Sequence, residues 1–193
     1  KKALPDTEDQ ALVYLYMSAE QLDKDSYLNI LNEFLTQYPN SMEGYVRRAN
    51  YYMGSEDAAQ YAQADADLKK ALDVASVKED AYYQVAKSIY GYVLSLNDKE
   101  PYQEWTMDKA LELIRTAIQT NEQPLHVQLE GDILFAQGKY ADAYASYEKF
   151  NQSTMASAAS YYSAAKAKQL TEGSDINEVL ALMDKAIEQL SKP

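Results

Sequence analysis

Apolar and small residues recur three and four positions apart along most of the chain, which predicts amphipathic helices throughout. The clearest example is residues 129–150, where this spacing continues on both sides of a break at Gln137, Gly138 and Lys139. A glycine directly after the last periodic residue is typical of a helix end, so this segment predicts a helical hairpin. Gly131 lies inside the first helix, where glycine costs about 1 kcal/mol relative to alanine. Its presence there predicts a close contact with another helix.

The second helix of this hairpin carries packing residues at positions i, i+4 and i+7. The same pattern recurs in four other segments, and the sets end at Phe34, Ala71, Ala117, Phe150 and Ala186. Successive sets are 37, 46, 33 and 36 residues apart. A period that persists over four steps predicts a stack of repeated helical pairs, because one such pair cannot bury its apolar face alone.

Each of these second helices follows a segment suited to be a first helix. The third pair is stretched by about a dozen residues around Pro101, which we expect to form a longer first helix and a loop. Asp175-Ile-Asn-Glu178 predicts a capping box that opens the last helix. That helix, residues 177–190, has a wide apolar stripe, so it either caps the stack or marks a chain that continues. The expected hairpins are residues 8–40, 41–77, 79–123, 124–155 and 156–191.

Small and aromatic residues of the clearest hairpin stand at the spacing found in tetratricopeptide repeats: Gly131, Gly138, Tyr140, Ala143 and Tyr147. Phe150 departs from the pattern, which usually has alanine at that position. From about residue 8 onward the chain therefore resembles the tetratricopeptide repeat (TPR) family, whose period is about 34 residues. The resemblance implies an all-α fold, a right-handed α–α superhelix (solenoid) of about five TPR-like hairpins. We expect it to form a single domain over residues 1–193.

By the same resemblance, the first helices line a concave face that binds a peptide or protein segment. The expected groove-facing residues are Tyr16, Glu20, Asn50, Met53, Tyr83, Lys87, Tyr90, Gln128, Asp132, Phe135, Tyr162 and Lys166. Aromatic side chains with a few polar groups suit recognition of an extended peptide or a helix. The alternative for each tyrosine is packing against an adjacent helix. A second hypothesis for the whole chain is a structural or assembly scaffold that uses its ends or convex face, with self-association as one form.

One TPR subtype holds a peptide's terminal carboxylate with lysine, arginine and asparagine side chains. Only Asn50 matches here, because Leu12 and Val46 stand where basic residues are needed. The spacing places Arg47 and Arg48 off that face. We therefore do not expect a carboxylate clamp.

The charge of the chain narrows the class of partner. Acidic residues number 30 and basic residues 18, a net charge of −12. Such a field repels phosphate backbones and anionic lipids, and no apolar run approaches the roughly twenty residues of a membrane span. We expect an unknown protein or peptide partner, no nucleic acid and no direct membrane insertion. The chain starts at Lys1 without an initiator methionine, so both a removed export signal and a cytoplasmic location stay open.

The sequence offers few candidate residues for catalysis or metal binding. There is no cysteine, and His126, directly after Pro124 and Leu125, is the only histidine, which excludes a multi-histidine metal site. A lone histidine there indicates a first-turn surface or packing residue. Acidic pairs such as Glu56 with Asp57 lack the ligand spacing of a calcium loop. We therefore expect no enzyme, cofactor or metal.

Overall fold

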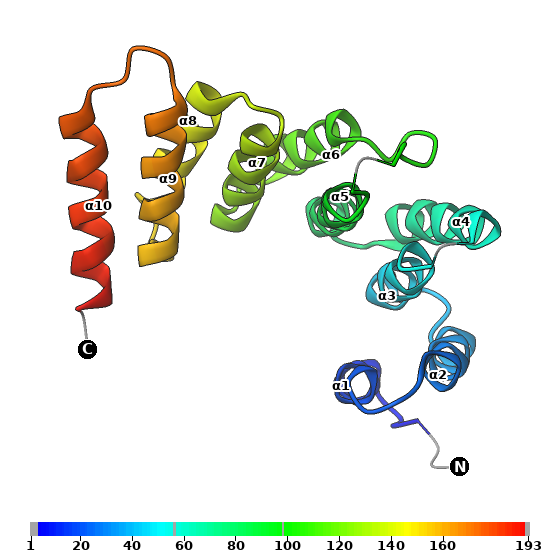
Figure 1. Cartoon of the computed structure of the whole chain (residues 1–193). Helices are drawn as coiled ribbons and strands as arrows, with labels where there is room; N and C mark the ends of the chain where they lie inside the picture. The colour runs from blue at the N-terminus through cyan, green and yellow to red at the C-terminus, as the bar shows by residue number, and fades with distance from the viewer. Residues whose placement is uncertain (1–3, 56, 98, 192–193) are drawn as a thin grey trace. The chain divides into compact units, whose positions relative to one another are not determined.

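The structure, a computed structural model, describes residues 4–55, 57–97 and 99–191. Within these ranges there are ten α-helices and no strand (Figure 1), which confirms the predicted all-α fold. One member of the acidic pair Glu56–Asp57, one residue of the inserted loop (Asp98) and the chain ends lie outside the described ranges. The helices are α1 (Glu8–Ala19), α2 (Lys24–Gln37), α3 (Met42–Met53), α4 (Ala58–Val74), α5 (Lys78–Leu94), α6 (Met107–Thr120), α7 (Pro124–Ala136), α8 (Tyr140–Phe150), α9 (Ala158–Leu170) and α10 (Ile176–Leu190).

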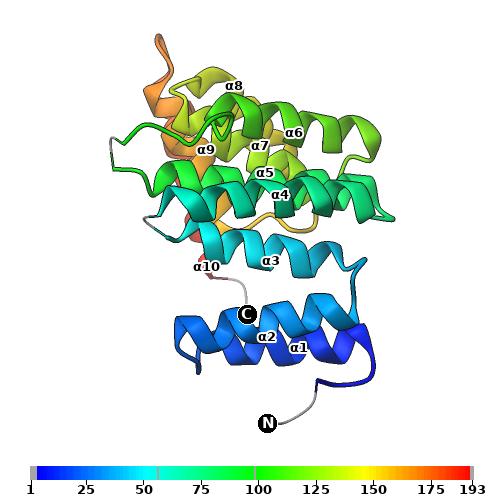
Figure 2. The same ribbon diagram turned by 90° about the vertical axis from the view of Figure 1, so that its right-hand side faces the viewer.

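The chain divides into two compact units, Lys1–Tyr102 and Gln103–Pro193. In the first unit each helix from α1 to α5 packs on the next, and α5 also packs on α3 (Figure 2). In the second unit each helix from α6 to α10 packs on the next. The two helices of the expected hairpin 79–123 therefore belong to different units. The single domain over residues 1–193 and the right-handed superhelix stay predictions.

Side chains just before several helices satisfy backbone N–H groups of the first turn, which explains where those helices begin. Ser41 accepts a hydrogen bond from the N–H of Gly44 at 3.2 Å, and Ser157 forms a capping box with Ser160. At α10, Asp175 accepts from the N–H of Asn177 at 2.9 Å. The predicted capping box at α10 is wrong: Asp175 accepts from the second N–H of the helix and not from the third, and the Glu178 carboxylate lies 2.5 Å from Lys168 Nζ.

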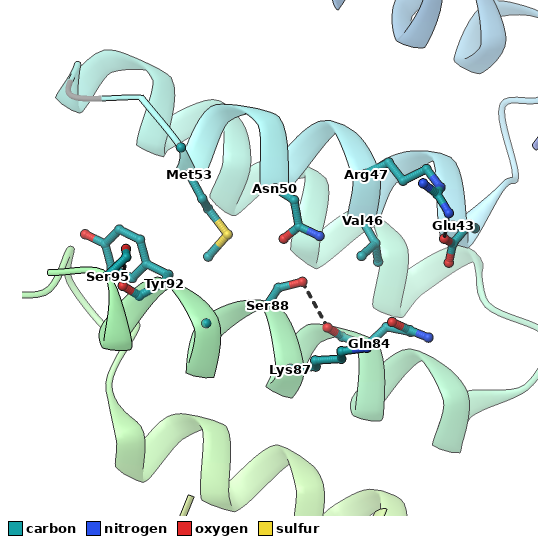
Figure 3. A pocket seen from close by; sticks show the side chains of 12 residues that line it. Glu43, Val46, Arg47, Asn50, Met53, Gln84, Lys87, Ser88, Tyr92 and Ser95 are labelled. Atoms are coloured by element: carbon teal, nitrogen blue, oxygen red, sulfur yellow. Dashed lines mark hydrogen bonds and ion pairs between the residues drawn. The ribbon is translucent and has the colours of Figure 1, made fainter. Parts of the chain in front are cut away.

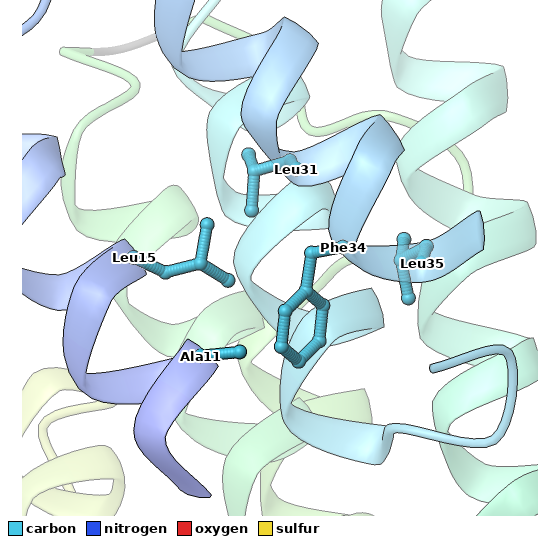
Figure 4. Close-up of a cluster of buried hydrophobic side chains, with 5 residues drawn as sticks. All are labelled: Ala11, Leu15, Leu31, Phe34 and Leu35. Carbon is cyan, nitrogen blue, oxygen red and sulfur yellow. The ribbon is translucent and has the colours of Figure 1, made fainter. Parts of the chain in front are cut away.

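The core of the first unit begins with a cluster of five buried side chains from α1 and α2. Figure 4 shows the ring of Phe34 beside Ala11, with Leu15 and Leu31 close by and Leu35 further along α2. All five are less than a tenth exposed. Because each helix of the unit buries only one face, this cluster joins α1 to α2.

A glycine and an aromatic ring set the spacing of α7 and α8 in the second unit. A Cβ atom built on Gly131 would lie 2.8 Å from a ring carbon of Tyr147, so α7 and α8 can approach this closely only with glycine there. The close contact predicted for Gly131 is therefore confirmed. The break between the two helices lies at Gly138, whose φ of +74° favours glycine.

Candidate functional site

The first unit contains an open groove of about 450 Å³ between α3 and α5, two consecutive first helices. Figure 3 shows side chains of both helices directed toward one another across it. Lys78, at the start of α5, helps to position this helix, because its Nζ donates to the carbonyls of Leu72 and Asp73 at the end of α4. The groove is lined by Glu43, Val46, Arg47, Asn50, Met53, Gly54, Gln84, Lys87, Ser88, Gly91, Tyr92 and Ser95.

The floor of the groove is apolar and well packed. Val46, Met53 and Tyr92 are buried although they line it. The ring of Tyr92 makes an edge contact with Tyr61 of α4 at 5.7 Å between centroids, and its hydroxyl accepts a hydrogen bond from the Tyr102 N–H at 3.2 Å. Burial raises the pKa of Tyr92, and that hydrogen bond partly offsets the effect. Tyr92 therefore provides a neutral, fixed part of the floor.

The neighbouring arginines of α3 have different surroundings. Arg47 lines the groove, where an Nη atom lies 2.8 Å from Glu43 and the guanidinium lies 5.3 Å from the ring centroid of Tyr16. Its Nε is buried and has no hydrogen-bond partner among the described residues. Arg48 instead binds Asp67 of α4 with two hydrogen bonds of 2.8 and 2.7 Å. Arg48 thus holds α3 on α4, while Arg47 lies at the rim of the groove, paired with Glu43.

Two carboxamides line the groove, Asn50 from α3 and Gln84 from α5. Within the described part of the chain, neither side chain has a hydrogen-bond partner. The hydroxyls of Ser88 and Ser95, by contrast, donate to backbone carbonyls of α5 at 3.0 and 2.7 Å. A carboxamide offers both a donor and an acceptor, which is the pattern that pairs with a peptide backbone.

Gly91 leaves the backbone of α5 open to the groove. A Cβ atom built there would meet no atom within 4 Å, so packing within the chain does not require this glycine. Glycine inside a helix costs about 1 kcal/mol relative to alanine. Its effect here is to leave this part of the α5 backbone uncovered by a side chain.

Seven of the predicted site residues lie in the first unit, and three of these, Asn50, Met53 and Lys87, line the groove. Tyr16 lies at its rim through the contact with Arg47. Tyr83 is half-buried, with Lys87 Nζ 5.8 Å from its ring centroid. The other two are Glu20, exposed at the end of α1, and Tyr90, half-buried on α5.

The other five predicted site residues lie in the second unit, and two of them take part in packing. Asp132 accepts a hydrogen bond from the Tyr147 hydroxyl at 2.8 Å, and the ring of Phe135 packs against Tyr140 at 5.3 Å. Tyr162 is 52% exposed on α9. The remaining two, Gln128 and Lys166, are partly buried.

Several residues that line the groove are not among the predicted site residues. The clearest are Glu43, Arg47, Gln84 and Gly91. The prediction that Arg47 lies off the groove-facing side is wrong. Arg47 stands three positions before Asn50, and residues three apart share a helix face. That spacing was the signal that could have identified it.

The lone histidine, metal sites and membrane spans can each be checked in the described part of the chain. His126 is buried, with its Nδ1 3.2 Å from the Asn121 carbonyl oxygen, so it packs between α6 and α7. Among the described residues no three His, Cys, Asp or Glu side chains form a group that could hold a metal. None of the helices in these ranges combines the length and hydrophobicity that a membrane span requires.

The fold is similar to that of known helical-repeat structures. MamA shares 20% identity with a TM-score of 0.61, covering 87% of this chain and 89% of its own. YrrB, described as a TPR protein with an unusual peptide-binding site, shares 16% identity with a TM-score of 0.60 over 95% and 86%. PilW, a type IV pilus biogenesis factor, shares 14% with a TM-score of 0.66 over 96% and 77%.

The TM-scores over most of each chain show a shared fold. The chain is therefore a helical-repeat protein with TPR-like architecture, as the packing of Gly131 against Tyr147 also indicates. No protein-family model matches the sequence, and no curated protein sequence matches it.

Proposed function

We propose that this chain is a protein-interaction module that binds an extended peptide or protein segment in the groove between α3 and α5. The observation that carries the proposal is the pair of carboxamides, Asn50 and Gln84, which face the groove without partners among the described residues. Polar groups held on two rigid helices can pair with a bound backbone at little entropic cost. Gly91 leaves the space that such a backbone needs.

The groove also offers contacts for side chains of the bound segment. Met53 and the Tyr92 ring provide apolar surface. Lys87 and Arg47 provide positive charge in a chain whose net charge is −12, with Glu43 beside Arg47. We therefore propose a segment with a small apolar residue over the floor and polar residues toward the rim.

The likeness to YrrB supports this proposal, because a TPR protein of that fold has a peptide-binding site. Tyr83 and Tyr90 on α5 are proposed to extend the site beyond the groove. The positions in the second unit, from Gln128 to Lys166, stay predictions. The proposal needs no catalytic residue or cofactor.

The test fills the groove without disturbing the fold. Peptides that bind the intact chain are first selected from a random phage-displayed library, and their affinities are measured by fluorescence anisotropy. Gly91→Leu should weaken binding at least about tenfold, which corresponds to ~1.4 kcal/mol. The matched control is Ala66→Leu, an exposed position on α4 outside the groove, which should change affinity less than about twofold.

Two further sets of variants sharpen the result. Asn50→Ala and Gln84→Ala should each weaken binding by about two- to tenfold, the usual net value of one hydrogen bond. Unchanged affinity in Gly91→Leu, with an intact circular dichroism spectrum, would contradict the groove assignment. Unchanged affinity in Tyr83→Ala and Tyr90→Ala would remove only those two tyrosines from the site.

A further inference from the structure

The last helix of the second unit carries an exposed apolar stripe. Ile176, Leu180, Ile187 and Leu190 are 60%, 54%, 61% and 77% exposed, and Met183 between them is partly buried. Their spacing of four, three, four and three residues places all five on one line along α10, as in a coiled-coil seam. A monomer seldom exposes so many large aliphatic side chains together unless they meet another surface.

The stripe lies to one side of the face that packs on α9. At 100° per residue, the buried side chains Val179, Leu182 and Ala186 point about a quarter turn away from the stripe. On the opposite side, Glu178 and Lys185 approach α9, at Lys168 and at the ring of Tyr161. The stripe is therefore directed away from the body of the second unit.

Equivalent positions on other second helices are covered by the next first helix. Leu35 of α2, equivalent to Ile187, is 6% exposed and packs against Gly44 of α3. Tyr61 of α4, equivalent to Ile176, contacts the ring of Tyr92 on α5. In the second unit, Tyr144 of α8, equivalent to Leu180, has Lys168 Nζ of α9 4.8 Å from its ring centroid. The α10 stripe is thus a stacking surface for an antiparallel helix.

We propose that this helix is α10 of a second copy of the chain, antiparallel to the first about a two-fold axis close to Met183. The stripe is self-complementary in this arrangement, because Ile176 opposes Leu190 and Leu180 opposes Ile187 on both sides of Met183. An antiparallel α10 also takes the direction of the first helix that would follow in the stack. Two-fold closure is the commonest solution for a surface that matches itself.

Charge favours this arrangement over a head-to-tail one, in which α1 of one copy packs on α10 of the next. At the other end of the chain, α1 exposes Val13 and Met17, but the same helix carries the acidic residues Glu8 and Asp9. Placing it on α10 would add those carboxylates to a seam that Asp184 already borders. In the α10–α10 pair, only Asp184 borders the seam near the axis, where it meets its own copy. Added salt and the substitution Asp184→Asn should both strengthen self-association.

Cysteine cross-linking tests the geometry directly, because the sequence contains no cysteine. Under mild oxidation, Met183→Cys should link to itself rapidly, since both copies lie near the axis. Ile176→Cys and Leu190→Cys should link when mixed, but neither should link alone. The control is Ala181→Cys, exposed on the polar face of α10, which should link more slowly. Rapid self-linking of Ile176→Cys, or equal rates at all positions, would overturn the antiparallel pair.

Light scattering on the full chain tests whether the pair forms in solution. The expected mass is twice 21.8 kDa. Leu180→Asp and Ile187→Asp should weaken association at least about a hundredfold with unchanged circular dichroism, because each dimer would bury two carboxylates. Val13→Asp should leave the dimer intact. Three outcomes would each overturn the proposal: a monomer at every concentration, open-ended growth that Val13→Asp abolishes, or α10 binding only a basic helix of another protein.

Discussion

Replacing Gly131 with alanine adds one methyl group to α7 where this helix crosses α8. The new Cβ would lie 2.8 and 2.9 Å from two ring carbons of Tyr147, well inside the roughly 3.5–4.0 Å separation that carbon atoms favour. The ring cannot easily move away, because it is only 3% exposed and its hydroxyl is held by Asp132 at 2.8 Å. The substitution therefore forces α7 and α8 apart.

Two opposing effects set the size of the change. Overpacking of this kind costs about 1–3 kcal/mol, whereas alanine gains about 1 kcal/mol over glycine inside a helix. We expect Gly131→Ala to lower the free energy of unfolding by about 1 kcal/mol. At Gly91 the same substitution meets no atom within 4 Å. Only the helix propensity remains there, so Gly91→Ala should raise the free energy of unfolding by about 0.5–1 kcal/mol.

Urea unfolding measures both changes. Trp105 fluorescence reports on the second unit, which contains Gly131, and circular dichroism reports on the whole chain. Midpoints are compared at a common denaturant slope. In a Tyr147→Leu background, Gly131→Ala should become neutral or stabilising, because the opposing ring is gone. Changes of the same sign at Gly131 and Gly91 would refute the packing argument.

Two further predictions concern buried charge. Burial raises the pKa of Asp132 above its ordinary value of 3.8, although the Tyr147 hydroxyl lowers it. Its favourable contribution to stability is therefore present below pH 3.8 and is lost as pH rises through the higher folded value. Asp132→Asn should reduce the change of the urea midpoint with pH across that range. An unchanged pH dependence of the midpoint would contradict this. Arg48→Ala leaves the Asp67 carboxylate, 5% exposed, without its main partner, so unfolding should become easier by about 2–4 kcal/mol. The double variant with Asp67→Ala should lose less than the sum of the single changes, and strict additivity would argue against the pair.

Much of the fold follows from short-range patterns in the sequence. Helical spacing and the repeated packing residues predict paired helices, because both depend on neighbours within one or two turns. Gly131 and Gly138 predict a close helix crossing and a helix end, because glycine is unfavourable inside a helix and common where a helix ends. Glu178 shows the limit of such patterns, since a partner on another helix, Lys168, competes with the capping box.

The groove is less predictable, because its lining depends on how two helices face each other. Arg47 is expected off the groove face, yet it stands three positions before Asn50 and lines the groove with it. Tyr92, part of the groove floor, is also held by a hydrogen bond from the inserted loop, which helical spacing does not predict. Gly91 has no local motif, and only the packing of α3 on α5 reveals the open space next to it.

The inserted loop has a consequence for how binding preference could change. Tyr102, at the end of the first unit, contacts the Tyr61 ring at 5.4 Å and donates its N–H to Tyr92. The floor of the groove is thus supported by a segment that contributes no lining residue itself. Loops tolerate insertion and substitution far better than helices do. Variation in this loop could therefore retune the shape of the groove while every residue of α3 and α5 stays the same.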